Sequence, residues 1–189
     1  MRYEKGRKDA TRRRITEVAS ERFRSDGIAA SGVASIMSDA GLTNGAFYPH
    51  FQSKEELVRE TVAAALDAQS VQIREALAAG GPDLAISMYL SAEHRDDPGK
   101  GCASAALLPE LARQPSETRR LYAERLESQV RQLSAALPPQ TKDPDAVALG
   151  VFATLIGTLQ LARAAAGTEL SDRILAAGAD AARALIRRS

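Results

Sequence analysis

The sequence has no tryptophan, and aromatic residues make up only 4% of its 189 positions. Its single cysteine, Cys102, excludes an internal disulfide. The two histidines, His50 and His94, lack metal-ligand spacing, and neither a glycine-rich phosphate loop nor a G-x-S-x-G nucleophile motif occurs. We therefore expect a protein that is not an enzyme and that binds no metal and no cofactor.

Long apolar runs are missing as well, because Arg, Asp or Glu interrupts every candidate membrane span. The charged N-terminus lacks the apolar core of a signal peptide. These two observations predict a cytoplasmic protein that makes no membrane contact.

The net charge of +1 conceals an asymmetry along the chain. Residues 1–54 hold ten lysines and arginines against six acids, which gives them +4 and leaves −3 for the remainder. A basic N-terminal part on a mildly acidic body is typical of a DNA-binding head. An ordinary solvated face would show the same asymmetry.

Apolar residues recur at helical spacing along most of the chain, which predicts an all-α protein. An S-x-x-E capping box at Ser53–Glu56 opens a long helix, and Gly80-Gly81-Pro82 ends it. This helix joins a three-helix head, residues 1–53, to a helical body, residues 54–189. Residues 2–8 are expected to be a basic arm, disordered when free. The predicted helices outside residues 31–52 are 9–26, 53–79, 83–94, 102–113, 115–137, 143–166 and 171–187.

Between residues 31 and 57 the pattern predicts a helix-turn-helix, whose second helix enters a DNA major groove. An apolar stripe marks its first helix: Val33, Ile36, Met37 and Ala40. Ser31 is expected to cap this helix, and Gly41 supplies the backbone freedom of the turn. Thr43 is expected to cap the short second helix, which carries residues 44–50.

The same segment closely resembles the TetR family of transcriptional regulators. The matching residues are Ala40-Gly41-Leu42-Thr43, Gly45, Phe47-Tyr48, His50-Phe51 and Ser53-Lys54-Glu55-Glu56-Leu57, with Ile15, Ala19, Phe23, Gly27 and Ile28 upstream. The match covers roughly the first third of the chain. It implies a dimeric, ligand-responsive regulator, by default a repressor, that binds a palindromic operator as double-stranded DNA.

Roles at the DNA follow for individual residues. Asn44 can pair with a base edge or a phosphate, and Gly45 and Ala46 let the backbone approach the groove. Phe47 and Phe51 are expected in the core. The expected DNA-binding set is Arg7, Lys8, Ser31, Thr43, Asn44, Gly45, Ala46, Tyr48, His50 and Lys54, with a buried structural role as the alternative for His50.

Two positions depart from the family pattern. Pro49 lies inside the expected recognition helix, where it removes a backbone donor and restricts Tyr48. Ala34 replaces a residue that is often polar or basic in relatives. We therefore expect the N-terminal arm to compensate by binding phosphates or the minor groove.

The last two helices are expected to form the dimer, since the family pairs these helices with their symmetry mates. Apolar residues run almost all round Asp143–Ala166, so this helix must be covered on every side. Carried over, Asp143–Ala166 and Ser171–Arg187 build the interface, with Gly150, Gly157 and Gly178 allowing close approach. An ordinary monomer core is the alternative.

In the family, a small molecule bound in the second domain shifts the long helix and moves the recognition helices out of register. We expect a small hydrophobic effector. The candidate lining residues are Met88, Tyr89, Cys102, Leu107, Leu108, Leu111, Tyr122, Leu126, Phe152, Ile156 and Gln160, with plain core packing as the alternative for each. Cys102, at an expected helix start near Lys100, is either a thiol sensor or an unreactive buried cysteine.

Overall fold

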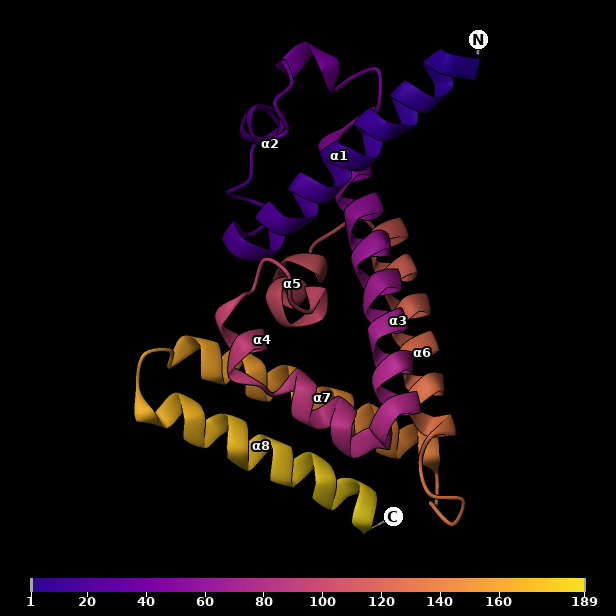
Figure 1. Ribbon diagram of the computed structural model, residues 1–189, viewed down its shortest axis with the longest axis vertical. Helices are drawn as coiled ribbons and strands as arrows, with labels where there is room; N and C mark the ends of the chain where they lie inside the picture. Colours follow the sequence, from indigo (N-terminus) through magenta and orange to yellow (C-terminus); the bar gives the residue numbers. More distant parts are fainter. Residues whose placement is uncertain (1, 189) are drawn as a thin grey trace.

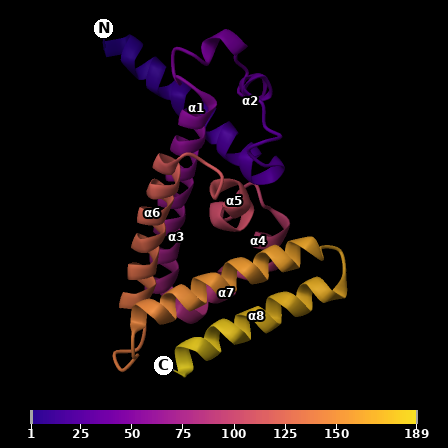
Figure 2. The same cartoon turned by 180° about the vertical axis from the view of Figure 1, so that it is seen from behind.

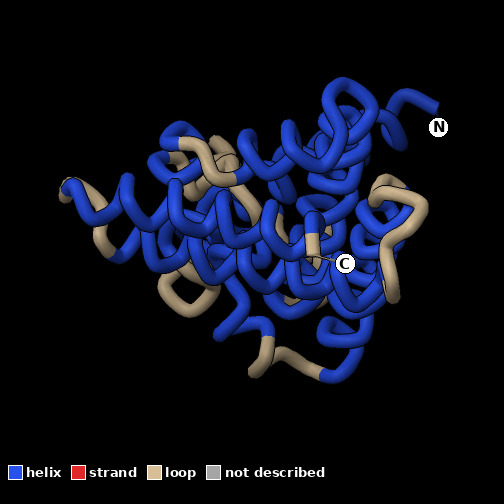
Figure 3. Tube along the Cα trace, turned by 90° about the horizontal axis from the view of Figure 1, so that it is seen from below, coloured by secondary structure: helices blue, strands red, loops and turns tan. Residues whose placement is uncertain are grey.

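The computed structural model describes residues 2–188, and every regular element in that range is helical (Figures 1 and 3). This confirms the all-α prediction. The elements are α1 (Arg2–Asp26), α2 (Val33–Asp39), the 3-10 turn η1 (Asn44–Ala46), α3 (Lys54–Tyr89), α4 (Ala92–Asp96), α5 (Ala103–Leu111), α6 (Ser116–Ala135), α7 (Pro144–Ala164) and α8 (Glu169–Arg187).

The helices form a small head on an elongated body. The head contains α1, α2 and η1, and α3 runs from it along the whole body beside α6 (Figures 1 and 2). At the far end, α7 packs against α6, and α8 returns antiparallel to α7 and contacts α3. The short helix α5 lies between the head and α7 and packs against α1, α3 and α7.

Two hydrophobic cores meet at α5. The head core is built from α1, α2, residues 43–51 (the recognition segment) and the first three turns of α3, and Ala103, Leu107 and Leu111 of α5 complete it. Ala105, on another face of α5, belongs instead to the body core formed with α3, α6, α7 and α8. Because one nine-residue helix belongs to both cores, a displacement of α5 changes the packing of the head.

The long helix α3 begins where the sequence predicts, and at the predicted stop it kinks and then resumes. The Ser53 hydroxyl accepts a hydrogen bond from the Glu56 amide at 3.2 Å, and the Glu56 carboxylate accepts one from the Gln52 amide at 2.7 Å. At the other end, Gly80 and Gly81 leave helical geometry, and Gly81 has a φ of 66° that disfavours any residue with a Cβ. After this kink the helix resumes and continues to Tyr89.

Three local predictions are wrong. The basic segment 2–8 is the start of α1 and not a disordered arm, since its good helix formers and the absence of proline let the helix propagate. Gly32, and not Ser31, caps α2, because the Ser31 hydroxyl is buried and donates to the Gly27 carbonyl at 2.7 Å. The helix expected over 83–94 breaks at residue 90, where the Ser91 hydroxyl accepts from the His94 amide and starts α4.

A further correction concerns α7. By length and composition this helix is apolar enough to cross a membrane, contrary to the sequence prediction. In the fold it packs against α5, α6 and α8 and contributes much of the body core, including Val151, Phe152 and Leu159. Its apolar character is therefore accounted for in part by core packing.

Candidate nucleic-acid interface and effector cavity

The turn between α2 and the recognition segment has the expected geometry. Gly41 has a φ of 66°, and Leu42 donates from its amide to the Met37 carbonyl at 2.8 Å. Thr43 occupies the N-cap position of η1, without a side-chain hydrogen bond. The recognition segment itself is only a 3-10 turn followed by further turns, and the predicted helix over residues 44–50 is wrong in this respect. Pro49, which lacks a backbone donor, stands where a continuing helix would need one.

The recognition segment has a buried side and an exposed side. Phe47 and Phe51 are each 1% exposed, and their rings stack with centroids 5.5 Å apart, which confirms their predicted core role. Tyr48 is 71% exposed, with its ring edge-on to Phe47. Thr43, Asn44 and Gly45 are exposed as well, and Ala46 is half-buried. The exposed residues therefore form one continuous stretch of polar side chains and bare backbone.

Arg12 holds this segment against α1 and α3, a role that the sequence pattern did not indicate. Its guanidinium lies 4.2 Å above the Phe51 ring and donates to the His50 carbonyl. It also pairs with Glu56 at 3.1 Å and with Glu60, and the Glu60 hydrogen bond is the largest cause that raises the pKa of Arg12. These partners lie 38 to 48 positions away in the sequence, so no local spacing could reveal the clamp.

The remaining predicted DNA-binding residues lie in different settings. Arg7 and Lys8 are exposed on the first turns of α1, whereas Ser31 is fully buried. Lys54 donates from Nζ to the Ile28 carbonyl at 2.5 Å, which ties α3 to the loop between α1 and α2. His50 is half-buried with no hydrogen-bond partner at Nδ1, and burial, followed by the charges of Lys8 and Arg12, lowers its pKa.

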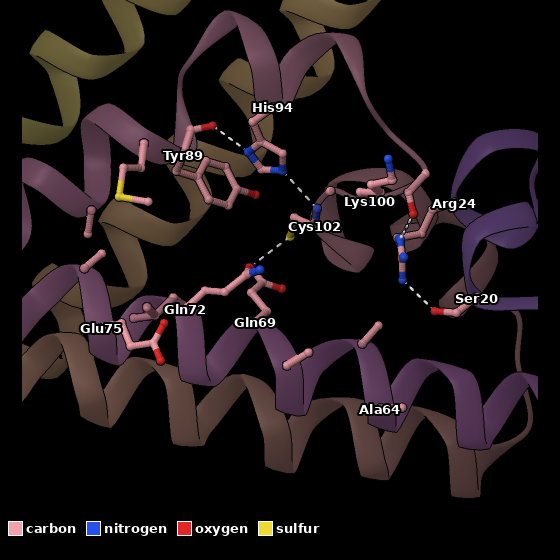
Figure 4. A pocket seen from close by; sticks show the side chains of 18 of the residues that line it. Ser20, Arg24, Ala64, Gln69, Gln72, Glu75, Tyr89, His94, Lys100 and Cys102 are labelled. Carbon is pink, nitrogen blue, oxygen red and sulfur yellow. Dashed lines mark hydrogen bonds between the residues drawn. The ribbon is translucent and has the colours of Figure 1, made fainter. Parts of the chain in front are cut away.

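A cavity of about 770 Å³ lies between the head and the body (Figure 4). One face of α3 between Ala64 and Ala79 lines it, as do Leu84, Ala85, Met88 and Tyr89 beyond the kink, His94 of α4, and residues 99–102. Helix α1 also lines it, through Thr16, Glu17, Ser20, Glu21 and Arg24. A molecule filling the cavity would therefore touch the head directly.

Only three of the predicted effector residues line this cavity: Met88, Tyr89 and Cys102. Leu107 and Leu111 are in the head core, and Phe152 and Ile156 are in the body core, with Leu108 and Leu126 packed against it. Tyr122 packs on the head core and donates to the Ser104 hydroxyl at 3.0 Å, while Gln160 donates to the Ala105 carbonyl at 3.2 Å. Sequence reasoning missed the glutamines Gln69 and Gln72, His94 and the wall formed by α1.

His94 organises one end of the cavity. Its Nε2 accepts a hydrogen bond from the Cys102 amide at 2.9 Å, and Nδ1 lies 2.6 Å from the Tyr89 carbonyl. Because an amide can only donate and a carbonyl can only accept, the ring is neutral with its proton on Nδ1. Burial lowers the pKa of His94, with a smaller contribution from Arg163, against the effect of the Tyr89 carbonyl.

Polar contacts link this cavity to the head at two places. Arg24 of α1 donates to the Gly99 carbonyl and to the Ser20 hydroxyl, both at 2.6 Å (Figure 4). At the far end of α5, the helix that begins beside Cys102, Glu110 accepts from the Ile28 and Ala29 amides. The cavity wall is thus joined both to α1 and to the loop that precedes α2.

The outer faces of α7 and α8 are apolar. Leu149 and Leu161 of α7 are 51% and 62% exposed, and Leu170 of α8 is 52% exposed. Between the two leucines of α7, Gly157 faces open space. Gly178, in contrast, serves the packing of α8 on α7 within the chain, since a Cβ there would lie 2.2 Å from Thr158.

Among residues 2–188, no group of three or more His, Cys, Asp or Glu side chains is arranged to hold a metal ion.

Comparison with known proteins identifies the head. Residues 15–61 match the family model of bacterial regulatory proteins of the tetR family. The HTH-type transcriptional repressor KstR2 from Rhodococcus jostii (strain RHA1) is 34% identical over 73 residues. That match covers 39% of this chain and 36% of KstR2, so it spans little more than a third of the relative's length.

Solved structures with the same fold cover nearly the whole chain. A TetR-family transcriptional regulator from Cytophaga hutchinsonii superposes with a TM-score of 0.78 at 21% identity, over 96% of this chain and 95% of that one. The reduced form of NemR from E. coli gives a TM-score of 0.74 at 19% identity, over 89% of this chain and 95% of that one. At these identities the likeness establishes the fold of the body.

Proposed function

Since this chain is a transcriptional regulator of the TetR family, we propose that it acts as a homodimeric repressor that a small effector releases from a palindromic operator. The family is one of regulators and not of enzymes. The observation that carries the proposal is the cavity shared by the body and α1, because it gives an effector direct contact with the DNA-binding head.

The proposed DNA surface is the exposed side of the recognition segment. Asn44 offers an amide that can read a base edge, and the Tyr48 hydroxyl can donate to a phosphate. Gly45 and the half-buried Ala46 allow the backbone to approach the groove. Thr43 stands at the N-terminus of η1, where free amides attract a phosphate. Because Ser31 is buried, we leave it out of this surface.

Basic residues on either side extend the proposed surface. Arg7 and Lys8 project from exposed turns of α1 and can bind phosphates as part of a rigid helix. His50 lies near the end of the recognition segment and Lys54 follows it, and Lys54 is already bonded to the Ile28 carbonyl. We therefore expect Lys54 to act partly by holding the loop between α1 and α2 in place.

The proposed dimer pairs α7 and α8 with the same helices of a second copy. The exposed leucines Leu149, Leu161 and Leu170 support this, since an apolar face on two adjacent helices gains stability when it is covered. The open space at Gly157 permits close approach of a partner helix. Two heads held about one helical turn of DNA apart would read a palindrome.

Release requires that the effector bind the DNA-incompetent arrangement better than the DNA-bound one. The cavity can supply this difference in affinity because its walls belong to both the head and the body. Helix α1 of the head lies on one side, and α3 and the loop before α5 lie on the other. The kink at Gly80-Gly81 lets residues 84–89 move relative to the first part of α3. Because such a regulator acts on chromosomal DNA, we propose a cytoplasmic location.

A selection of genomic DNA fragments with the purified protein tests the proposal. We expect enrichment of a recurring palindrome, weakened by added salt because phosphate contacts release counterions. Protein that has been denatured and refolded, and so freed of any copurified effector, is the control. Failure of both preparations to enrich a palindrome would contradict the proposed function.

A second candidate signal is thiol chemistry at Cys102. The thiol lines the cavity and accepts a hydrogen bond from the Gln69 amide at 3.1 Å, so a reactive compound inside the cavity would reach it. Under this alternative, a thiol-reactive compound releases the operator from the wild type and not from Cys102→Ser. Equal release of the operator from both proteins would contradict this alternative.

A further inference from the structure

Two buried polar atoms on the cavity wall have no hydrogen-bond partner. One is Oε1 of Gln69, a residue that is 8% exposed, and the other is the Tyr89 hydroxyl, which has the weakly accepting Cys102 thiol beside it. Both side chains line the cavity near Cys102. The Nε2 atom of Gln69 donates a hydrogen bond to the Cys102 thiol at 3.1 Å (Figure 4). Buried polar groups in native proteins are rarely left unpaired, so two on one wall indicate a ligand that pairs with them.

These two atoms require a ligand with complementary hydrogen-bonding groups. The amide oxygen of Gln69 can only accept, so its partner must be an O–H or N–H donor. The Tyr89 hydroxyl can donate to an oxygen on the same ligand. Burial, and the Cys102 thiol beside it, raise the pKa of Tyr89 well above its ordinary value, so the proton stays on the phenol. A hydroxyl or an amide group carries both a donor and an acceptor and therefore matches the chemistry of both atoms.

The charges of the cavity argue against an ionised ligand at this wall. Gln69, Tyr89 and the neutral ring of His94 provide no counterion there. The cation beside them, Arg163, does not line the cavity and donates instead to the His94 and Arg95 carbonyls. The carboxylates Glu17, Glu21 and Glu75 and the ammonium of Lys100 belong to exposed residues. Arg24 already donates to Gly99 and Ser20. A carboxylate or ammonium group beside Gln69 would therefore lose its hydration without gaining a partner.

The apolar part of the lining is mostly made of small side chains on α3. Its members are Ala64, Ala65, Ala68, Ile73, Ala76, Ala79, Leu84, Ala85 and Met88. Together with a volume of about 770 Å³, this wall suits an apolar body of the size of one or a few fused rings or a medium-length chain.

We propose that the effector is an uncharged apolar compound with one hydroxyl or amide group, which accepts from Tyr89 and donates to Gln69. This inference rests on the proposed function for its biological meaning, but binding at the cavity can be measured without DNA. The proposal assigns Gln69 and Tyr89 as the residues that determine specificity among apolar ligands.

Three naphthalene probes test the assignment: 2-naphthol, which donates and accepts, 2-methoxynaphthalene, which only accepts, and 2-naphthoate, which is charged. The absence of tryptophan makes the fluorescence of bound naphthalenes easy to follow. We expect 2-naphthol to bind about fivefold tighter than 2-methoxynaphthalene, the worth of one neutral hydrogen bond, and 2-naphthoate to bind weakest. No binding of any probe, or tightest binding of 2-naphthoate, would overturn the proposal.

Variants locate the two hydrogen bonds. In Gln69→Leu the preference for 2-naphthol over 2-methoxynaphthalene should disappear, whereas in Tyr89→Phe both should weaken by about fivefold. Gln72→Leu, which changes an exposed glutamine of the same cavity, is the matched control and should leave the preference intact. A preference that survives Gln69→Leu would overturn the assignment even if the variant folds and binds.

A DNA-binding measurement on the same samples separates this inference from the proposed function. Loss of the palindrome selection with intact probe preferences would remove the regulator proposal and leave the ligand site. If the protein binds its operator but probe binding does not depend on Gln69 or Tyr89, the regulator proposal stands and the proposed ligand site is removed.

Discussion

The carboxylate of Glu110 accepts a hydrogen bond from the backbone amide of Ile28 at 2.9 Å, across 82 positions of sequence. Its other oxygen accepts from the Ala29 amide at 2.8 Å. Glu110 is near the end of α5, whose first turn lies beside the cavity, and the two amides are in the loop that leads into α2. One short helix thus links the candidate effector site to the start of the helix-turn-helix.

Replacing Glu110 by alanine should loosen this link. The Ile28 and Ala29 amides would lose a charged acceptor, and we expect the free energy of unfolding to fall by roughly 1–3 kcal/mol. DNA binding should weaken as well, since the loop positions α2. The Glu110→Gln variant keeps one carbonyl acceptor. Its free energy of unfolding and its DNA affinity should therefore lie between those of the wild type and of the alanine variant. Chemical denaturation and operator titration measure both effects, and an alanine variant equal to the wild type in both would contradict the link.

Tyr48 offers a test of the DNA surface with little effect on folding. Its side chain is 71% exposed, so Tyr48→Phe should change the free energy of unfolding by less than about 0.5 kcal/mol. The phenylalanine keeps the ring contact with Phe47 and removes only the hydroxyl. If that hydroxyl donates to a phosphate, affinity should fall about fivefold on every DNA sequence alike.

Asn44→Ala is the contrasting variant in the same experiment. A residue that reads a base edge should, when removed, reduce discrimination at one operator position by about 1–3 kcal/mol. Affinity for unrelated DNA should change little. Uniform weakening by Asn44→Ala together with unchanged binding by Tyr48→Phe would reverse the two assigned roles.

The sequence predicted those structural features that depend on contacts between residues close together in the chain. The capping box at Ser53 and the turn at Gly41 each depend on neighbours within a few positions, and the structure has both. The helix stop predicted at Gly80-Gly81 is present as a kink, after which α3 continues to Tyr89. The burial of Phe47 and Phe51 was also predicted, because both residues belong to the motif that resembles the TetR family. The start of α1 was missed because no stop signal distinguishes an arm from a helix in a charged segment.

The effector cavity could not be predicted, because distant segments build it. Arg24 meets Gly99 across 75 positions, and Gln69 meets Cys102 across 33. The predicted residues between 107 and 160 lie on apolar helix faces, and the fold uses those faces as core. Apolar periodicity shows that a helix face is covered, and it does not show whether protein or a ligand covers it.

The apolar face of α7 and α8 can be tested through Leu161, which is 62% exposed. Leu161→Glu should leave the folded monomer nearly as stable and shift the protein from dimer to monomer, since it places a charge in the proposed interface. Operator binding should weaken together with dimerisation. Sedimentation equilibrium measures the shift, and Val71→Glu, at a 40% exposed apolar position of α3, is the matched control. A Leu161→Glu protein that stays dimeric would place the interface elsewhere.

The hydrogen bonds of His94 predict a pH dependence of stability. Burial lowers the pKa of His94 in the folded protein below 6.5, its ordinary value, so the unfolded chain takes up the proton first as the pH falls. Above about pH 6.5 both states are neutral at this residue and it causes no pH dependence. Below that value stability should decline until the pH reaches the folded-state pKa, because the protonated ring could no longer accept from the Cys102 amide.

His94→Gln should flatten this decline between pH 7 and pH 5, because its amide oxygen can still accept from Cys102 and does not titrate. His50→Asn is the matched control: the pKa of His50 is lowered as well, so that variant removes only the share of the decline that belongs to the head. Denaturation curves at several pH values, with the two histidine resonances followed by NMR, separate the contributions. A His94 resonance that titrates above pH 6.5 would contradict the prediction, because burial would then not keep the ring neutral in the folded protein.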